Sequence, residues 1–94
     1  MLSKQTGPSV VVAVTGTNSI VNLSNTDGSA VRKVRIAVAT APAIISITTS
    51  TNLITVGILI PEGHVEHFSL EGNTHIHIVR SGSTNGIASI TPVA

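Results

Sequence analysis

The chain contains no cysteine, no tryptophan and no tyrosine, and Phe68 is its single aromatic residue. Without cysteine it can form no disulfide, no thiolate metal site and no cysteine nucleophile. Without aromatic clusters it lacks the stacking platforms that bind single-stranded nucleic acid. Charge is also scarce, because there are only five basic and four acidic residues and the net charge is +1. We therefore expect no nucleic-acid partner, since such binding needs a clustered positive field.

Long apolar runs are missing too. A membrane helix takes about 20 apolar residues, and the longest runs here are the short stretches "VVVAV" and "ILI". We expect neither a membrane partner nor a signal peptide at the start of this sequence. The 94 residues suffice for one small domain. We place that domain at residues 8–94 and treat residues 1–7 as a flexible N-terminal arm.

Residues that favour β-structure are abundant, with 12 valines, 12 isoleucines and 12 threonines. Side chains branched at Cβ are stiff at χ1 and pack well on a pleated surface. They gather in short runs that glycine, proline or asparagine interrupts about every ten residues. Eight short strands with this spacing predict an all-β sandwich or barrel. The expected strands are residues 10–15, 20–24, 31–40, 44–49, 53–60, 65–70, 74–79 and 87–93.

Apolar and other side chains alternate within three of these runs. Because a strand points successive side chains to opposite sides, every second residue shares a face. The expected apolar faces are Val34, Ile36 and Val38, opposite Lys33 and Arg35; Ile54, Val56, Ile58 and Ile60, opposite Thr55 and Gly57; and Ile76 and Ile78, opposite His75 and His77.

Two histidines lie one residue apart in the run "HIHIV". On a strand, His75 and His77 point the same way and lie about 6.5–7 Å apart along the chain. Such a pair can bind a metal where a third ligand or symmetry-related copies complete the site. The pair is similar to the H-x-H ligands that hold iron on the axis of phage tail-spike tips. We expect the histidines instead to face solvent or a neighbouring subunit, with Ile76 and Ile78 in the core.

The sequence offers no clear set of catalytic groups. His64 and His67 lie near Glu62, Glu66 and Glu71, but "HVEH" is not the H-E-x-x-H metal motif. On a strand, its first and last residues diverge. No serine is paired with a histidine in a nucleophile motif, and no phosphate loop or dinucleotide fingerprint occurs. We therefore expect a protein that is not an enzyme, with no catalytic residue, no metal and no cofactor.

Charged residues are grouped by sign along the chain. A basic trio opens the third run, and three of the four acidic residues, Glu62, Glu66 and Glu71, follow later in the chain. These groups form either solvated strand ends or complementary patches between neighbouring subunits, which set register and partner choice more than affinity. The interface candidates are Arg32, Lys33, Arg35, Glu62, Glu66, His75 and His77.

Four stretches occur in an order that resembles a family of small virion structural proteins of tailed bacteriophages. They are "SIVNLSNTDGSAVRKVRIAVA" (19–39), "ILIPEGHVEHFSL" (58–70), "EGNTHIHIV" (71–79) and "NGIASITPV" (85–93). The resemblance implies a single antiparallel, jelly-roll-like β-sandwich and brings no catalytic residues with it. The four histidines are a departure from the family's pattern.

The resemblance also implies a function. The chain would be a capsid decoration (cement) protein that binds where capsomers meet and stabilises the shell. Its partners would be the major capsid protein and copies of itself, as a homotrimer. It would be located on the capsid surface of the virion, and in the host cytoplasm before assembly. One alternative is a tail spike or fibre component with His75 and His77 on a symmetry axis. A second is a cupin-like domain that binds a small ligand or metal.

Overall fold

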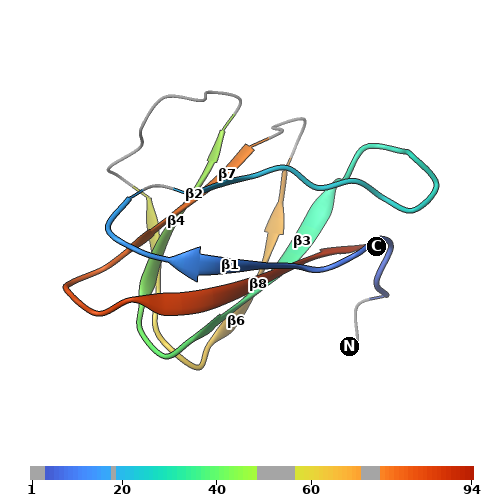
Figure 1. Ribbon diagram of the computed structural model, residues 1–94. Coiled ribbons are helices and arrows are strands. Elements are labelled where there is room, and N and C mark those ends of the chain that lie inside the picture. Colours follow the sequence, from blue (N-terminus) through green and yellow to red (C-terminus); the bar gives the residue numbers. More distant parts are fainter. Residues whose placement is uncertain (1–3, 18, 49–56, 71–74) are drawn as a thin grey trace.

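The computed structural model describes residues 4–17, 19–48, 57–70 and 75–94 (Figure 1). These residues form two four-stranded sheets, with strand orders β1-β8-β3-β6 (the first sheet) and β2-β7-β4-β5 (the second sheet). No helix suited to crossing a membrane occurs in this described part of the chain. The strands are β1 Val10–Val14, β2 Ser19–Val21, β3 Lys33–Ala39, β4 Ala43–Thr48, β5 Ile58–Ile60, β6 Val65–Ser69, β7 His75–Arg80 and β8 Gly86–Val93.

Strand pairing follows one rule throughout the two sheets. β1 pairs with β8, β2 with β7, β3 with β6, and β4 with β5, and every pair is antiparallel. The pairs β3–β8 and β4–β7 then complete the sheets. Pairing of the first strand with the last, the second with the second last, and so on inward is the arrangement of an eight-stranded jelly roll. The expected antiparallel, jelly-roll-like sandwich is confirmed.

β2 and β3 are each at least two residues shorter than the sequence predicts, and β3 spans Lys33–Ala39 instead of residues 31–40. β2 ends at Val21 instead of residue 24, because the chain leaves the edge of β7 there and crosses to the N-terminal segment. The amide of Thr26 donates to the carbonyl of Thr6 at 2.9 Å. The described part of the fifth strand is limited to Ile58–Ile60, and residues 53–56 of that prediction lie outside the described residues.

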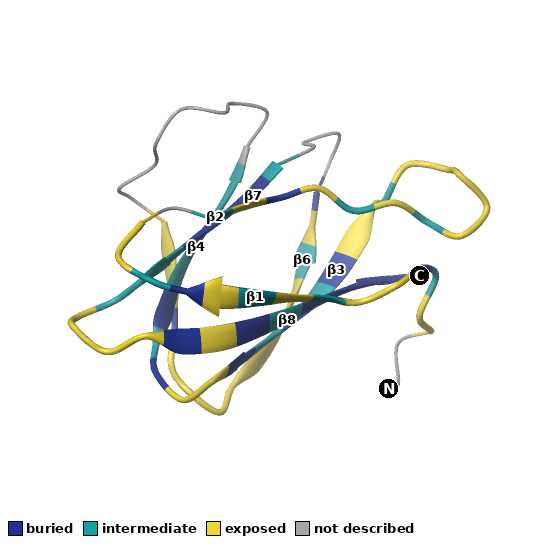
Figure 2. Ribbon diagram, viewed as in Figure 1, coloured by how far each residue is buried: buried dark blue, intermediate teal, exposed yellow. Residues whose placement is uncertain are grey.

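An aliphatic core fills the space between the two sheets. Ile36 of β3 lies opposite Ile90 of β8, and both side chains are completely buried. Ile45, Ile76 and Ile78 cover them from the second sheet. Burying one such side chain contributes about 1.5–3 kcal/mol. Figure 2 shows the burial along the strands: more and less exposed residues alternate along β1 and the first half of β8, and the last four residues of β8 are all buried.

The predicted alternation is confirmed for β3, whose Val34, Ile36 and Val38 are all buried. It fails in part for β5. Ile60 is completely buried, whereas Ile58 is 55% exposed although both side chains point to the same side of the strand. β5 is an edge strand of the second sheet, so no neighbour flanks Ile58 on its outer side.

The N-terminal segment lies along the end of β8. The amide of Thr6 donates to Pro92 at 2.9 Å, and the amide of Ala94 donates to Lys4 at 2.8 Å. An isolated β-bridge joins Gln5 to Val93. Residues 4–6 of the expected arm are therefore hydrogen-bonded to the sandwich, and residues 1–3 lie outside the described residues.

Replacing Ile36 by alanine should lower the free energy of unfolding by about 2–5 kcal/mol, because it leaves a cavity at the centre of the core. Denaturant unfolding followed by circular dichroism measures the change. Ile58→Ala removes the same atoms from a half-exposed site and should cost about 1 kcal/mol or less. Equal losses for the two variants would contradict the position of the core.

Candidate functional site

Aliphatic side chains cover part of the solvent side of the first sheet. Cross-strand pairing places Ala13, Ile87 and Ala39 in one row and Val11, Ser89, Ala37 and Val65 in the next. Val11 is 70% exposed, Ile87 48% and Val65 42%. With strands about 4.8 Å apart, the second row spans roughly 14 Å across the sheet. We call this surface the apolar face, and its members are Val11, Ala13, Ala37, Ala39, Val65 and Ile87.

The same side of the sheet becomes basic toward the start of β3. The next row contains Thr91, Arg35 and His67, and the row beyond it contains Lys33 between Val93 and Ser69. Arg35 is half-buried and Lys33 is exposed. The outer surface of the first sheet therefore has an aliphatic half and a basic half.

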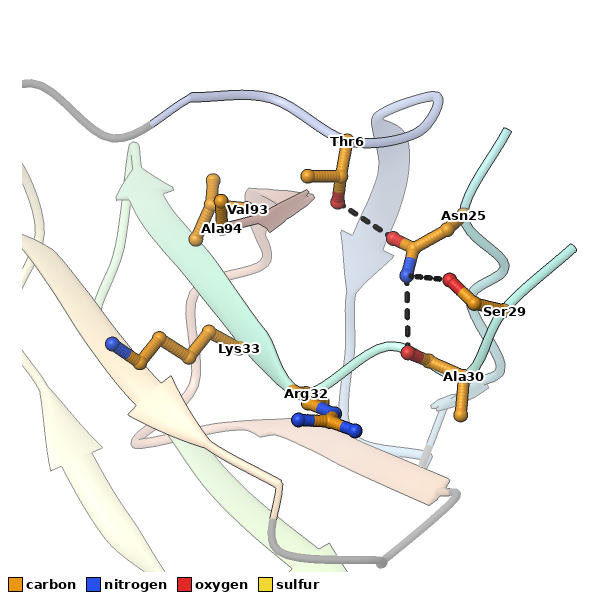
Figure 3. A pocket seen from close by; sticks show the side chains of 8 residues that line it. All are labelled: Thr6, Asn25, Ser29, Ala30, Arg32, Lys33, Val93 and Ala94. Atoms are coloured by element: carbon orange, nitrogen blue, oxygen red, sulfur yellow. Dashed lines mark hydrogen bonds between the residues drawn. The ribbon is translucent and has the colours of Figure 1, made fainter. Parts of the chain in front are cut away.

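An open cavity of about 370 Å³ lies next to this basic half (Figure 3). In Figure 3, Thr6 lies on one side of it and Arg32 and Lys33 lie on the other. The N-terminal segment, the loop before β3 and the end of β8 meet here. The lining residues are Thr6, Asn25, Ser29, Ala30, Arg32, Lys33, Val93 and Ala94.

Asn25 organises the uncharged wall of the cavity. Its Oδ1 accepts a hydrogen bond from Thr6 Oγ1 at 2.6 Å. Its Nδ2 donates to Ser29 Oγ and to the carbonyl of Ala30, both at 3.0 Å. Both the oxygen and the nitrogen of the Asn25 side chain are thus hydrogen-bonded. The charged groups in the cavity lining belong to Arg32 and Lys33.

Asp27 lies in the loop beside the cavity, and its carboxylate is hydrogen-bonded within that loop. Its Oδ1 accepts hydrogen bonds from Ser29 Oγ at 2.6 Å and from the amide of Ser29 at 2.9 Å. The hydroxyl bond, followed by the amide bond, lowers the pKa of Asp27 below its ordinary value. The carboxylate therefore closes an Asx-type turn.

The acidic candidates lie elsewhere. Glu62 is exposed in the turn between β5 and β6. Glu66 is exposed on β6, opposite Ile36 of β3. Among the described residues, neither carboxylate forms an ion pair, and the same holds for the basic trio. Both alternatives from the sequence, solvated strand ends and complementary patches between subunits, therefore stay predictions.

The two central histidines differ in their surroundings. Ile76 and Ile78 lie in the core, as expected. His75 is half-buried, whereas His77 is only 1% exposed, so the expectation that both histidines face solvent or a neighbouring subunit is wrong for His77. β7 is an inner strand, and its register places Ile20 of β2 on one side of His77 and Ser46 of β4 on the other.

The other two histidines, His64 and His67, are exposed near the β5–β6 turn and on β6. Within residues 4–17, 19–48, 57–70 and 75–94, no three histidine, aspartate or glutamate side chains are grouped so as to hold a metal ion. A site with His75 and His77 would thus need ligands from beyond these residues.

Comparisons of this chain with protein-family models, with curated proteins and with solved structures find no match. Its function is therefore argued from its own surface.

One part of the apolar face is recognisable in the sequence. The run "VVVAV" is apolar at every position, so its strand can be two-sided or pair with the edge of another subunit. The rest of the face was absent from the residues singled out there. A signal for Ile87 is that it lies three residues from Ile90 on one strand, so the two side chains point to opposite faces.

Replacing Ser29 by alanine should raise the pKa of Asp27 toward its ordinary value, because one of the two hydrogen bonds to the carboxylate is lost. A lowered pKa stabilises the fold above the unfolded-state pKa, and this stabilisation is lost as pH falls through the folded-state pKa. Carboxyl chemical shifts followed by NMR through an acid titration measure the change. Ser83→Ala, in an exposed turn, is the control; an unchanged titration in Ser29→Ala would contradict the assignment.

Proposed function

We propose that this chain is a self-associating structural module of a virion, and specifically a capsid decoration protein that binds at capsomer junctions. The observation that carries the proposal is the apolar face. Val11 of β1, Ile87 of β8 and Val65 of β6 expose 42–70% of their surface on the outer side of the first sheet. Contiguous exposed apolar surface of this kind marks interaction sites in soluble proteins. A partner protein that covers this face removes it from water.

The edge of the first sheet supports the same proposal. β1 is an edge strand, and Val10–Val14 includes no charged residue and no proline. Ser19 Oγ donates to the carbonyl of Ala13 at 3.3 Å, so that carbonyl points away from β8. The backbone groups of Val11, two residues earlier, point the same way. Edges without charge, proline or bulge invite pairing with another chain, and here the apolar face extends to that edge.

The jelly-roll topology is compatible with this role without deciding it. Jelly rolls occur in viral capsid proteins, in lectins and in cupins, so the fold alone does not determine the function. The rest of the support is the resemblance of the four stretches to virion proteins. The metal-based alternatives gain nothing from His77, whose ring is buried. We therefore prefer the decoration protein.

Replacing Ile87 by lysine should weaken self-association at least tenfold, because the new charge must be desolvated in the contact. Light scattering after size-exclusion chromatography measures the oligomer from nanomolar to micromolar concentration. Ser83→Lys adds the same charge to the exposed loop between β7 and β8, which is not part of the apolar face, and should leave the oligomer unchanged. Circular dichroism shows whether each variant is folded.

The capsid role is tested by sedimentation. Purified protein is mixed with capsid shells that lack it and separated on a density gradient. We expect it to sediment with the shells, and Ile87→Lys to reduce the bound fraction. A protein that stays monomeric at micromolar concentration and remains at the top of the gradient would overturn the proposal.

A further inference from the structure

Opposite charges lie at the two ends of β3. Lys33 is the first residue of this strand, directly after Arg32 at the cavity. At the other end, Val38 is hydrogen-bonded to the turn that carries Glu62. In Figure 1 the chain termini and the loop before β3 lie to the right, while the turn between β5 and β6 lies at the bottom.

The acidic end is a well-defined turn of residues 61–64. The amide of His64 donates to the carbonyl of Pro61 at 3.3 Å, and Gly63 has φ +78°. Because φ is positive at Gly63 but not at Glu62, this is a type II turn with Glu62 at its second position. Two further hydrogen bonds fix it to β3: Gly63 N to Val38 O at 2.7 Å and Val38 N to His64 O at 3.1 Å. Glu62 is thus held outward on a rigid support.

The basic end is the cavity of about 370 Å³ described above. Its uncharged polar side chains, Asn25, Ser29 and Thr6, are hydrogen-bonded to one another. The nearby carboxylate of Asp27 is engaged by Ser29. Among the described residues, Arg32 and Lys33 form no ion pair, so they can receive a carboxylate from outside.

The two ends cannot meet within one molecule. Five residues of extended strand separate Lys33 from Val38, which amounts to roughly 17 Å. Glu62 and the cavity can therefore pair only between copies. We propose that copies of this chain associate head to tail, with the Glu62 turn of one copy inserted in the Arg32–Lys33 cavity of the next.

This inference rests on the proposed self-association and gives it a direction. A turn on one copy and a cavity on the next form a heterologous contact, which produces a closed ring when the rotation closes. A homotrimer is one such ring. The guanidinium of Arg32 can receive both carboxylate oxygens of Glu62 in a planar, bidentate pair. Charge pairs of this kind set orientation and partner choice, while the apolar face supplies buried area.

Charge reversal on either side of the contact tests the proposal. Glu62→Lys places like charges on both sides, and the double variant Arg32→Glu/Lys33→Glu does the same from the cavity side. Each should weaken self-association about tenfold or more, measured by light scattering across a dilution series. The triple variant that joins the two changes has a basic turn and an acidic cavity, and should recover the wild-type oligomer.

The control is Ser83→Lys. It adds a positive charge to the exposed loop between β7 and β8, outside the turn and the cavity, and should leave the oligomer unchanged. Added salt should weaken the association of the wild-type and triple variants in parallel, since both depend on the same charge pair. Circular dichroism spectra verify that every variant retains the β-sandwich.

Each other outcome overturns the head-to-tail contact. One-sided variants that associate like the wild type show that the pair is not formed, and a triple variant that fails to recover shows that the residues do not meet. Loss of shell binding in the cavity variant alone would identify the shell as the occupant. Phosphate that binds to the cavity without weakening self-association would make it an anion site.

The two proposals fail separately. If wild-type protein associates and Ile87→Lys disrupts the oligomer while the charge variants have no effect, only the head-to-tail contact is lost. If wild-type protein is monomeric and does not bind shells, the proposed function is lost with it.

Discussion

The register of β3 against β8 determines both surfaces of the first sheet at once. Ile36 lies opposite Ile90 on the inner side, and one residue further along, Ala37 lies opposite Ser89 on the outer side. A shift of one residue would exchange the two sides of the moved strand and expose its buried residues. The aliphatic core and the apolar face are therefore consequences of a single pairing, and neither can change without the other.

Most of the fold follows from local patterns in the sequence. Each of the eight expected runs overlaps a strand of the structure, because Cβ-branched residues and regular turn signals are both local properties. Periodicity also identified the buried sides of β3 and β7. What it could not supply is lateral position within a sheet. His77 is buried on the inner strand β7, whereas Ile58 is 55% exposed on the edge strand β5.

The candidate site likewise has features that the local sequence predicts and features that depend on the fold. The charged residues could be named from the sequence, since their signs are grouped along the chain. The cavity could not, because its lining comes from segments around residues 6, 25–33 and 93–94, which only the jelly-roll closure brings together. Likewise, the placement of opposite charges at the two ends of β3 depends on the β5–β6 turn returning to Val38.

Apolar and charged surfaces have different effects on association. An aliphatic surface contributes free energy in proportion to buried area and specifies little about orientation. Charges separated by the length of a strand specify orientation but contribute little where solvent screens them. A small domain buries a limited fraction of its surface on folding, so covering the apolar face in an oligomer also stabilises the folded chain by mass action. In the proposed oligomer, assembly and fold stability would thus be coupled.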